Sequence, residues 1–275
     1  QGNLVKLIEE TGAIWRYTWD GRHNRLSDTD PLGNVTTYTY DDRGNVLTVD
    51  DPLNPPVVHT YEPAFSKRAS TTDARGFRTQ WGYDAKGNLR TVTDPLTQVA
   101  SFDYDAFGNR TAQTDPRRIR TAFAYDGFDR LIERRSQLVT GDVVTTFEYD
   151  ALGRLTARVD PNGHRTAWAY DALGRLLEVT QHLDPSTPVK TAFAYDKNGR
   201  TFSITDAEGR VASFTYDAAG RRISVTDPLN QLTAFRYDGL GNITEVVVAN
   251  GAVTQFAYDG KGNQTKIINP LQQAT

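Results

Sequence analysis

The chain has 275 residues, and its 31 Lys and Arg residues nearly balance 34 Asp and Glu residues, for a formal net charge of −3. So small a net charge provides no long-range field for nucleic acid or an anionic membrane surface, and we expect neither as a partner. The absence of cysteine excludes disulfides and thiolate metal sites, and no apolar run approaches the ~20 residues of a membrane span.

A two-residue phrase, an aromatic residue followed by an acidic one, recurs along the chain with spacings of 21 to 25 residues. Its twelve copies begin at Trp19, Tyr40, Tyr61, Tyr83, Tyr104, Tyr125, Tyr149, Tyr170, Tyr195, Tyr216, Tyr237 and Tyr258. This regularity predicts one array of about twelve 21-residue hairpin repeats over residues 1–275. The first copy lacks its beginning and the last lacks its returning strand, so we expect the array to be truncated at both ends.

A first turn signal, Asp-x-x-Gly, directly follows the aromatic residue. Asp accepts hydrogen bonds from the backbone of a type I turn, and Gly at the fourth position adopts positive φ. The pattern is clearest at Asp84 with Gly87, Asp150 with Gly153, and Asp171 with Gly174. Gly occupies the fourth position in nine of twelve copies, and the exceptions are assigned to His23, Phe65 and Asp129.

A second turn signal, Asp-Pro-x-(Gly or Asn), lies halfway between the aromatic phrases, as in Asp30–Gly33, Asp160–Gly163 and Asp227–Asn230. Turns every 10 or 11 residues leave strands of about six residues and no room for helices. The sequence therefore predicts an all-β chain, a continuous antiparallel meander of hairpins.

Aromatic residues also stand two positions before the phrase in eleven of twelve copies. Period-two spacing places both rings on one face of the sheet, so stacked copies form two aromatic ladders. We interpret the tyrosines of the phrase as structural residues, because rings needed for packing recur in every copy. A sugar-binding surface on the ladder is the alternative. The remaining strand positions are rich in Arg and Thr, which suits a wall wetted over much of its surface.

Candidate catalytic and metal sites are sparse. Asp30 and Asp160 head complete Asp-Pro-x-Gly sequences, but they are 130 residues apart and turn chemistry accounts for both. No calcium-binding loop pattern is present, and His23, His59, His164 and His182 are scattered, so we expect surface or turn positions for them. The sequence predicts no catalytic residue, cofactor or metal site, and therefore no enzyme.

Three longer segments lie near the second turn: Asp51–Pro56, Arg135–Asp142 and Gln181–Pro188. We expect them to project from the same edge of the sheet and to be the best places for specific contacts. Simple tolerance of length in surface loops is the alternative.

The copies Tyr149–Leu155 and Tyr170–Leu176, together with the Asp-Pro turns, resemble the YD repeats of the Rhs (rearrangement hotspot) family. The resemblance covers essentially the whole chain and includes toxin-complex shell subunits and teneurin receptors. It implies a hollow β-shell, or cocoon, wound as a spiral of hairpins. The self-cleaving segment that ends such shells, with its closely spaced Asp-Pro-x-Gly motifs, is not found here.

The resemblance also implies a function: a structural shell of a bacterial Rhs-type toxin that sequesters a C-terminal toxin domain until delivery. The implied partners are the rest of the same shell, the enclosed toxin and a secretion or injection apparatus, and the implied location is secreted or delivered. A cell-surface adhesion or carbohydrate-binding YD-repeat protein is the alternative.

Overall fold

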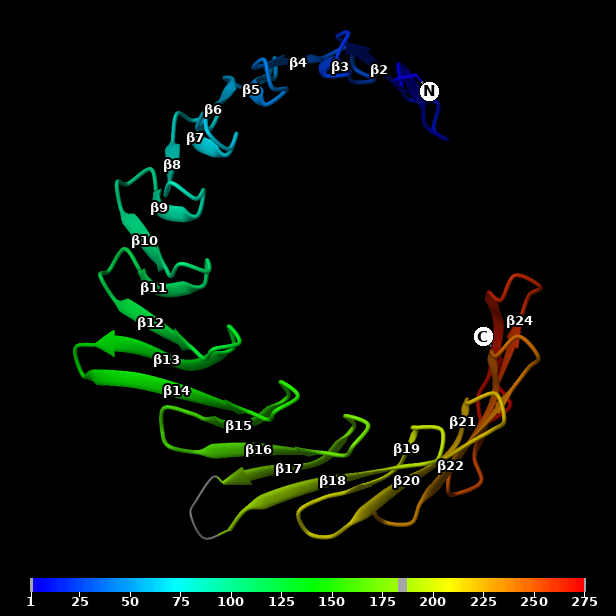
Figure 1. Ribbon diagram of the computed structural model, residues 1–275. Helices are drawn as coiled ribbons and strands as arrows, with labels where there is room; N and C mark the ends of the chain where they lie inside the picture. Colours follow the sequence, from blue (N-terminus) through cyan, green and yellow to red (C-terminus); the bar gives the residue numbers. More distant parts are fainter. Residues whose placement is uncertain (1, 183–186, 275) are drawn as a thin grey trace. The chain divides into compact units, whose positions relative to one another are not determined.

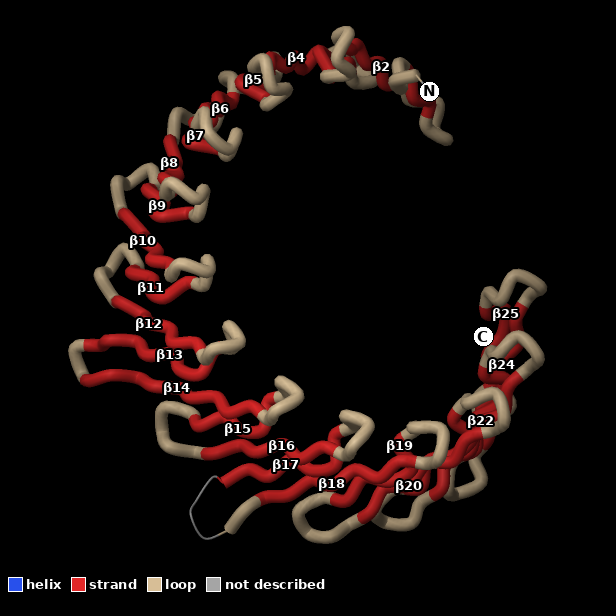
Figure 2. The backbone as a smooth tube through the Cα atoms, in the orientation of Figure 1, coloured by secondary structure: helices blue, strands red, loops and turns tan. Residues whose placement is uncertain are grey.

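The computed structural model describes residues 2–182 and 187–274, and their regular structure consists entirely of β-strands (Figures 1 and 2). Twenty-five strands belong to one sheet, and the recorded pairings between successive strands are antiparallel. The predicted all-β, antiparallel meander of hairpins is thereby confirmed.

The chain divides into two compact units, residues 1–144 and 145–275. The first unit contains β1 (Lys6–Ile8), β2 (Ile14–Trp19), β3 (Arg25–Thr29), β4 (Val35–Tyr40), β5 (Val46–Asp50), β6 (Val57–Tyr61), β7 (Arg68–Thr72), β8 (Arg78–Tyr83), β9 (Leu89–Thr93), β10 (Val99–Tyr104), β11 (Arg110–Thr114), β12 (Arg120–Tyr125) and β13 (Leu131–Leu138). β14 (Gly141–Tyr149) begins in the first unit and ends in the second.

The second unit continues with β15 (Leu155–Val159), β16 (Arg165–Tyr170), β17 (Leu176–His182), β18 (Val189–Tyr195), β19 (Thr201–Thr205), β20 (Val211–Tyr216), β21 (Arg222–Thr226), β22 (Leu232–Tyr237), β23 (Ile243–Val247), β24 (Val253–Tyr258) and β25 (Gln264–Ile268).

A β-bulge marks each aromatic residue of the phrase. In the hairpin of β12 and β13, Ala124 faces Glu133 but Tyr125 faces Leu131, so one strand carries an extra residue. The same register shift occurs at all twelve copies. A bulge interrupts the hydrogen-bond ladder and increases the local twist of the strands.

The two faces of the sheet differ in chemistry, because residues directly opposite each other on paired strands share a face. We call the face that carries the tyrosines the aromatic face; there Phe214 lies opposite Val225. On the other side, the polar face, the Thr215 and Ser224 hydroxyls form a 2.5 Å hydrogen bond. Further along the polar face, Arg165 forms a 2.8 Å ion pair with Glu148.

The sheet is a single layer with almost no enclosed core. Among the described residues, Ala112 and Ala157 are the buried hydrophobic residues. The accessible surface is 18005 Å², whereas a compact monomer of this mass exposes about 11,900 Å². Stability must therefore come largely from the backbone ladder, the turns and contacts between adjacent hairpins.

Candidate functional site

The turns at the two ends of the strands have the same geometry. In the first turn at Asp41, the Asp41 amide donates to the Asn45 carbonyl at 2.9 Å, and the Gly44 amide donates to the Asp41 carbonyl at 3.0 Å. Asp41 Oδ1 accepts hydrogen bonds from the amides of Arg43 and Asn45 at 2.9 and 2.8 Å. Asp30 repeats this pattern in a second turn. Each aspartate thus satisfies backbone donors that the turn leaves free.

The predicted turn residues occupy these positions. Asp84, Asp150 and Asp171 head first turns, and their fourth residues Gly87, Gly153 and Gly174 have φ of 83°, 83° and 84°. A side chain is strained in this left-handed region. At Gly87 a Cβ atom would also lie 3.1 Å from the Phe65 ring.

One of the three exceptions to the turn glycine forms a different turn. His23 and Asp129 adopt positive φ at the fourth position, but in the third copy the left-handed residue is Ser66, with φ of 54°, and not Phe65. That turn is one residue longer, as the hydrogen bond from the Glu62 amide to the Lys67 carbonyl demonstrates. Glu62 replaces Asp there, and its longer carboxylate accepts bonds from the amides of residues 64, 65 and 67.

Hydrogen bonds to the turn carboxylates lower their pKa values. For Asp171 the main cause is the Arg175 backbone amide, helped by the Arg175 side chain. For Asp84, desolvation by itself would raise the pKa. Hydrogen bonds from Asn88 and Lys86 outweigh it, so the pKa is lowered. These carboxylates are held in the charged state, as a permanent turn acceptor requires.

Tyrosine hydroxyls connect each hairpin to the one before it. Eight of them donate, at 2.7 to 3.0 Å, to the carbonyl of a bulge residue in the preceding hairpin. The donors are Tyr40, Tyr83, Tyr125, Tyr170, Tyr195, Tyr216, Tyr237 and Tyr258. Tyr104 and Tyr149 end β10 and β14 at the equivalent place. The hydroxyl supplies a donor where the bulge interrupts the ladder.

Arginines at the fifth position of the first turn add a second connection in the second unit. Arg154, Arg175, Arg200 and Arg221 each donate to the aspartate of their own turn at 2.6 to 2.7 Å. Each guanidinium lies 4.7 to 4.9 Å from the ring centre of the tyrosine in the next hairpin. All except Arg175 also donate to the carbonyl of the next turn's aspartate, at 2.9 to 3.1 Å.

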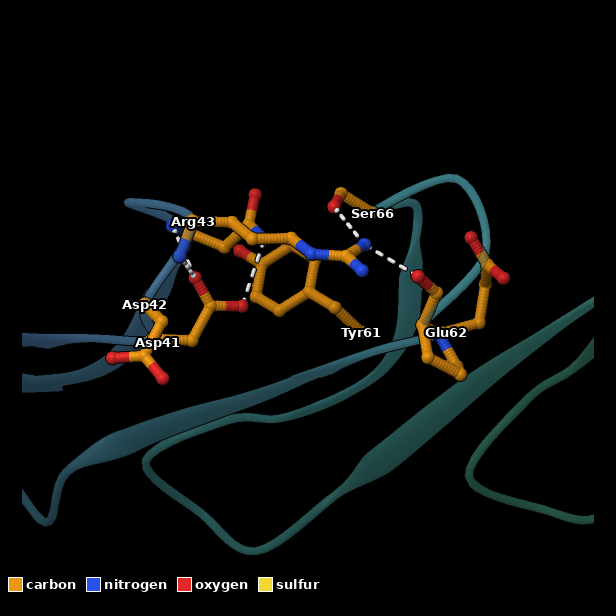
Figure 3. A pocket seen from close by; sticks show the side chains of 8 residues that line it. Asp41, Asp42, Arg43, Tyr61, Glu62 and Ser66 are labelled. Carbon is orange, nitrogen blue, oxygen red and sulfur yellow. Dashed lines mark hydrogen bonds between the residues drawn. The ribbon is translucent and has the colours of Figure 1, made fainter.

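The first unit makes this connection differently, because Asn commonly replaces Arg at the fifth position. The third residue is basic instead: Arg22 donates to the Asp42 carbonyl and Lys86 to the Ala106 carbonyl, both at 2.8 Å. Figure 3 shows Arg43 reaching across to the Pro63 carbonyl and to Ser66 Oγ. In the longer third turn, Lys67 reaches the Gly87 carbonyl at 2.5 Å. We call a basic side chain that bonds to the next first turn a bridging residue.

These bridging residues were missed by the sequence analysis. The signal was the choice between Arg and Asn at the residue after the turn glycine, to which the sequence analysis assigned no meaning. Both donate to the same aspartate, since Asn45 Nδ2 lies 2.8 Å from Asp41 Oδ2. Of these two side chains, only arginine is long enough to reach the next hairpin. The difference between Arg and Asn therefore matters only when one hairpin lies beside the next.

The histidines do not all lie at the surface or in turns. His23 and His164 belong to turns, and His182 ends β17. His59 is 9% exposed in β6, where it takes the place of the missing ladder aromatic, and its Nδ1 lies 3.0 Å from Thr71 Oγ1. Burial lowers the His59 pKa. The expectation of a surface or turn position was therefore wrong for His59.

The other candidates form no catalytic or metal cluster in the described parts of the chain. Asp30 and Asp160 both accept turn amides, in different units. No group of three potential metal ligands exists among the described residues. The same residues contain no helix long and apolar enough to cross a membrane.

One of the longer segments forms strands where we expected a loop, and another lies partly outside the described residues. The extra residues within Arg135–Asp142 lengthen strands, giving β13 eight residues and β14 nine. For Gln181–Pro188, β17 extends to His182, while residues 183–186 lie outside the described residues. Asp51–Asn54 forms an Asp-headed turn before β6, as the second-turn signal indicated.

Comparison with known proteins identifies the class of repeat. The family model described as RHS Repeat matches residues 24–54, 67–99, 83–120, 104–137, 140–165, 149–187, 195–232, 219–253 and 237–274. The chain belongs to the RHS repeat family, which confirms the resemblance found in the sequence. No curated protein sequence matches the chain significantly.

Solved structures of Tc toxin components are among those that match the chain. The TcdB2-TccC3-Cdc42 crystal structure has a TM-score of 0.65 and 15% identity, and the match covers 93% of this chain and 15% of that one. TcdB2-TccC3 without its hypervariable C-terminal region gives 0.65 and 16%, with coverage of 93% and 15%. The Photorhabdus luminescens Tc holotoxin pore gives 0.62 and 16%, with coverage of 95% and 17%. This chain thus spans about a sixth of their length.

Proposed function

We propose that this chain is a segment of the wall of an Rhs-type β-shell, which encloses a C-terminal toxin domain and keeps it apart from the cell until delivery. The observation that carries the proposal is the single-layer sheet with two differently built faces and almost no core of its own. A wall has to separate two compartments, and a hydrogen-bonded sheet does so without a second layer.

The chemistry of the hairpin contacts supports this reading. Tyrosine hydroxyls and bridging residues join one hairpin to the next near the first turns. Without them, only the backbone hydrogen bonds between strands would hold the array together there. Neighbours that share the fold are Tc toxin structures, one of which was solved without a hypervariable C-terminal region. A toxin passenger, the remainder of the shell and a delivery apparatus are accordingly the partners we propose, and export or injection from a bacterium is the location.

A non-enzymatic role fits the turn carboxylates, which are occupied by backbone amides. For the alternative of glycan binding by the ladder, rings would have to be accessible. Tyr216 instead donates its hydroxyl to Thr201 and has Arg200 over its ring. We therefore do not favour adhesion through the ladder.

The proposal is tested by cryo-EM of the full-length gene product that contains these repeats. We expect a closed shell that includes this ribbon and holds internal density connected to the C-terminal region. An open ribbon, or a closed shell with density for the C-terminal region only outside, would refute enclosure.

A further inference from the structure

One junction of the first unit lacks a bridging residue. It lies between the first turn that begins at Asp105 and the next, which begins at Asp126. The third residue of the first of these turns is Phe107 and the fifth is Asn109, so neither is basic. At the other four junctions of first turns within this unit, Arg22, Arg43, Lys67 and Lys86 bridge.

A groove with a cavity volume of about 420 Å³ occupies this junction. Its lining includes the carboxyl residues Asp105, Asp126 and Asp129, the rings of Phe107 and Tyr125, and no Lys or Arg. Asn109 Nδ2 donates to Asp105 at 3.1 Å and to Asp129 at 2.6 Å. Arg130 forms an ion pair with Asp126, so the groove combines the negative charges of Asp105 and Asp129 with aromatic surface, a combination that attracts a planar cation.

The second unit demonstrates which cation such a junction holds. There the guanidinium of Arg200 contacts three groups: the aspartate of its own turn, the tyrosine ring of the next hairpin, and the carbonyl of the next turn's aspartate. The corresponding groups at the empty junction are Asp105, Tyr125 and the carbonyl of Asp126. The Asp126 carbonyl accepts one bond from the Asp129 amide, at 3.1 Å, and a carbonyl has two lone pairs.

The two arginines nearest to the groove are directed elsewhere. Arg130 donates to Asp126 at 2.7 Å and lies 5.1 Å from the Phe128 ring centre. Arg110 donates to Gln113 and lies 5.3 Å from the Phe102 ring centre. Neither places its guanidinium between Asp105 and Tyr125 as Arg200 does between Asp196 and Tyr216.

We propose that this groove is a binding site for an arginine side chain of a partner polypeptide, whose guanidinium takes the position that the chain's own arginines take in the second unit. Arginine is favoured over lysine because a planar guanidinium stacks on Tyr125 while it donates in its plane to a carboxylate and a carbonyl. The site goes beyond the proposed shell function and does not depend on it.

The test is an NMR titration of the chain with capped Gly-Arg-Gly peptide, with capped Gly-Lys-Gly as the control probe. We expect saturable amide shifts confined to residues 105–109 and 125–129, and clearly weaker binding of the lysine peptide. The substitution Asn109→Arg supplies the missing guanidinium from within the chain and should weaken binding by at least ~10-fold. Asn242→Arg is the matched control. The junction of the first turns at Asp238 and Asp259 also lacks a basic third or fifth residue, but it has Leu240 and Gly262 where the groove has Phe107 and Asp129, so this variant should leave binding to the groove unchanged.

A second variant separates loss of the carboxylate from loss of the turn. Asp129→Gly introduces the residue that nine other copies have, at a position with φ of 60°, so the turn is retained. Binding should fall about two- to fivefold, as for loss of one exposed ion pair. Equal affinity for the two peptides, unchanged binding after Asn109→Arg, shifts spread over many acidic turns, or no saturable shift would each overturn the proposal.

Discussion

Replacing Arg200 with Asn tests whether contacts between hairpins, as opposed to contacts within a turn, stabilise the ribbon. Asn at this position still reaches the turn aspartate, as Asn45 does at 2.8 Å. The variant therefore removes mainly two contacts: the stack on Tyr216, at 4.7 Å, and the 3.1 Å hydrogen bond to the Asp217 carbonyl.

The magnitude follows from those two contacts. The Arg200 side chain is 26% exposed, so both contacts are partly shielded from water. A cation–π contact contributes about 0.5–1 kcal/mol and a hydrogen bond about 0.5–1.5 kcal/mol. The expected loss is about 1–2.5 kcal/mol in the free energy of opening the two hairpins, equivalent to about five- to sixtyfold faster amide exchange.

Hydrogen exchange of amides in β19 and β20 measures this loss locally, which matters because an array of repeats need not unfold in two states. Arg210→Asn is the matched control. Arg210 is also the fifth residue of an Asp-headed turn, but it is 59% exposed and its ion pairs are to Asp206 and Glu208 of its own turn. If both variants accelerate exchange equally, stabilisation through bridging between hairpins is refuted.

Three further predictions concern the tyrosines, the turn carboxylates and the glycines. Tyr216→Phe removes a 2.7 Å hydrogen bond and should lower stability to urea by about 1 kcal/mol, whereas Tyr104→Phe, whose hydroxyl has no recorded partner among the described residues, should have little effect. The pKa of Asp171 is lowered, chiefly by the Arg175 amide, so its contribution is complete above its unfolded pKa and lost as pH falls through the folded value. The circular dichroism strand signal should accordingly be constant from about pH 5 to 8 and decrease below about pH 4, and a loss already beginning near pH 6.5 would contradict this. Gly87→Ala should destabilise more than Gly76→Ala in thermal unfolding, because φ is nearly equal, at 83° and 84°, but only Gly87 has neighbouring atoms within 4 Å; equal losses would exclude the contact with Phe65 as the cause.

The fold was predictable from local chemistry because most copies contain both turn signals in their sequence. Asp and Gly at fixed spacing specify the turn, and the strands between them are too short for any other element. The third copy was the least predictable. Its inserted residue places the left-handed conformation at Ser66 and not at Phe65, and its replaced ladder aromatic puts His59 at a buried position.

The contacts between hairpins were not predictable to the same degree. Tyr170 was recognised as a ladder residue, but the acceptor of its hydroxyl, the Leu155 carbonyl, depends on the bulge that shifts the register. The length of the Arg154 side chain matters only once the next hairpin lies beside it. The spacing of residues in the sequence predicts neither the register shift at the bulge nor the distance between adjacent turns.

Because the turns at both ends of the strands are alike, the number of hairpins in such a sheet can vary. Two small alanines are the enclosed hydrophobic residues in the described part of the chain, which therefore has no common centre to which every residue must fit. Eight hairpins donate a tyrosine hydroxyl to a carbonyl of the one before, so most contacts join only neighbouring copies. A copy can therefore be inserted or deleted whole, changing the width by about 9.6 Å, the span of two strands, while the junctions stay alike. Modularity of this kind lets the dimensions of the sheet change independently of the chemistry that holds it together.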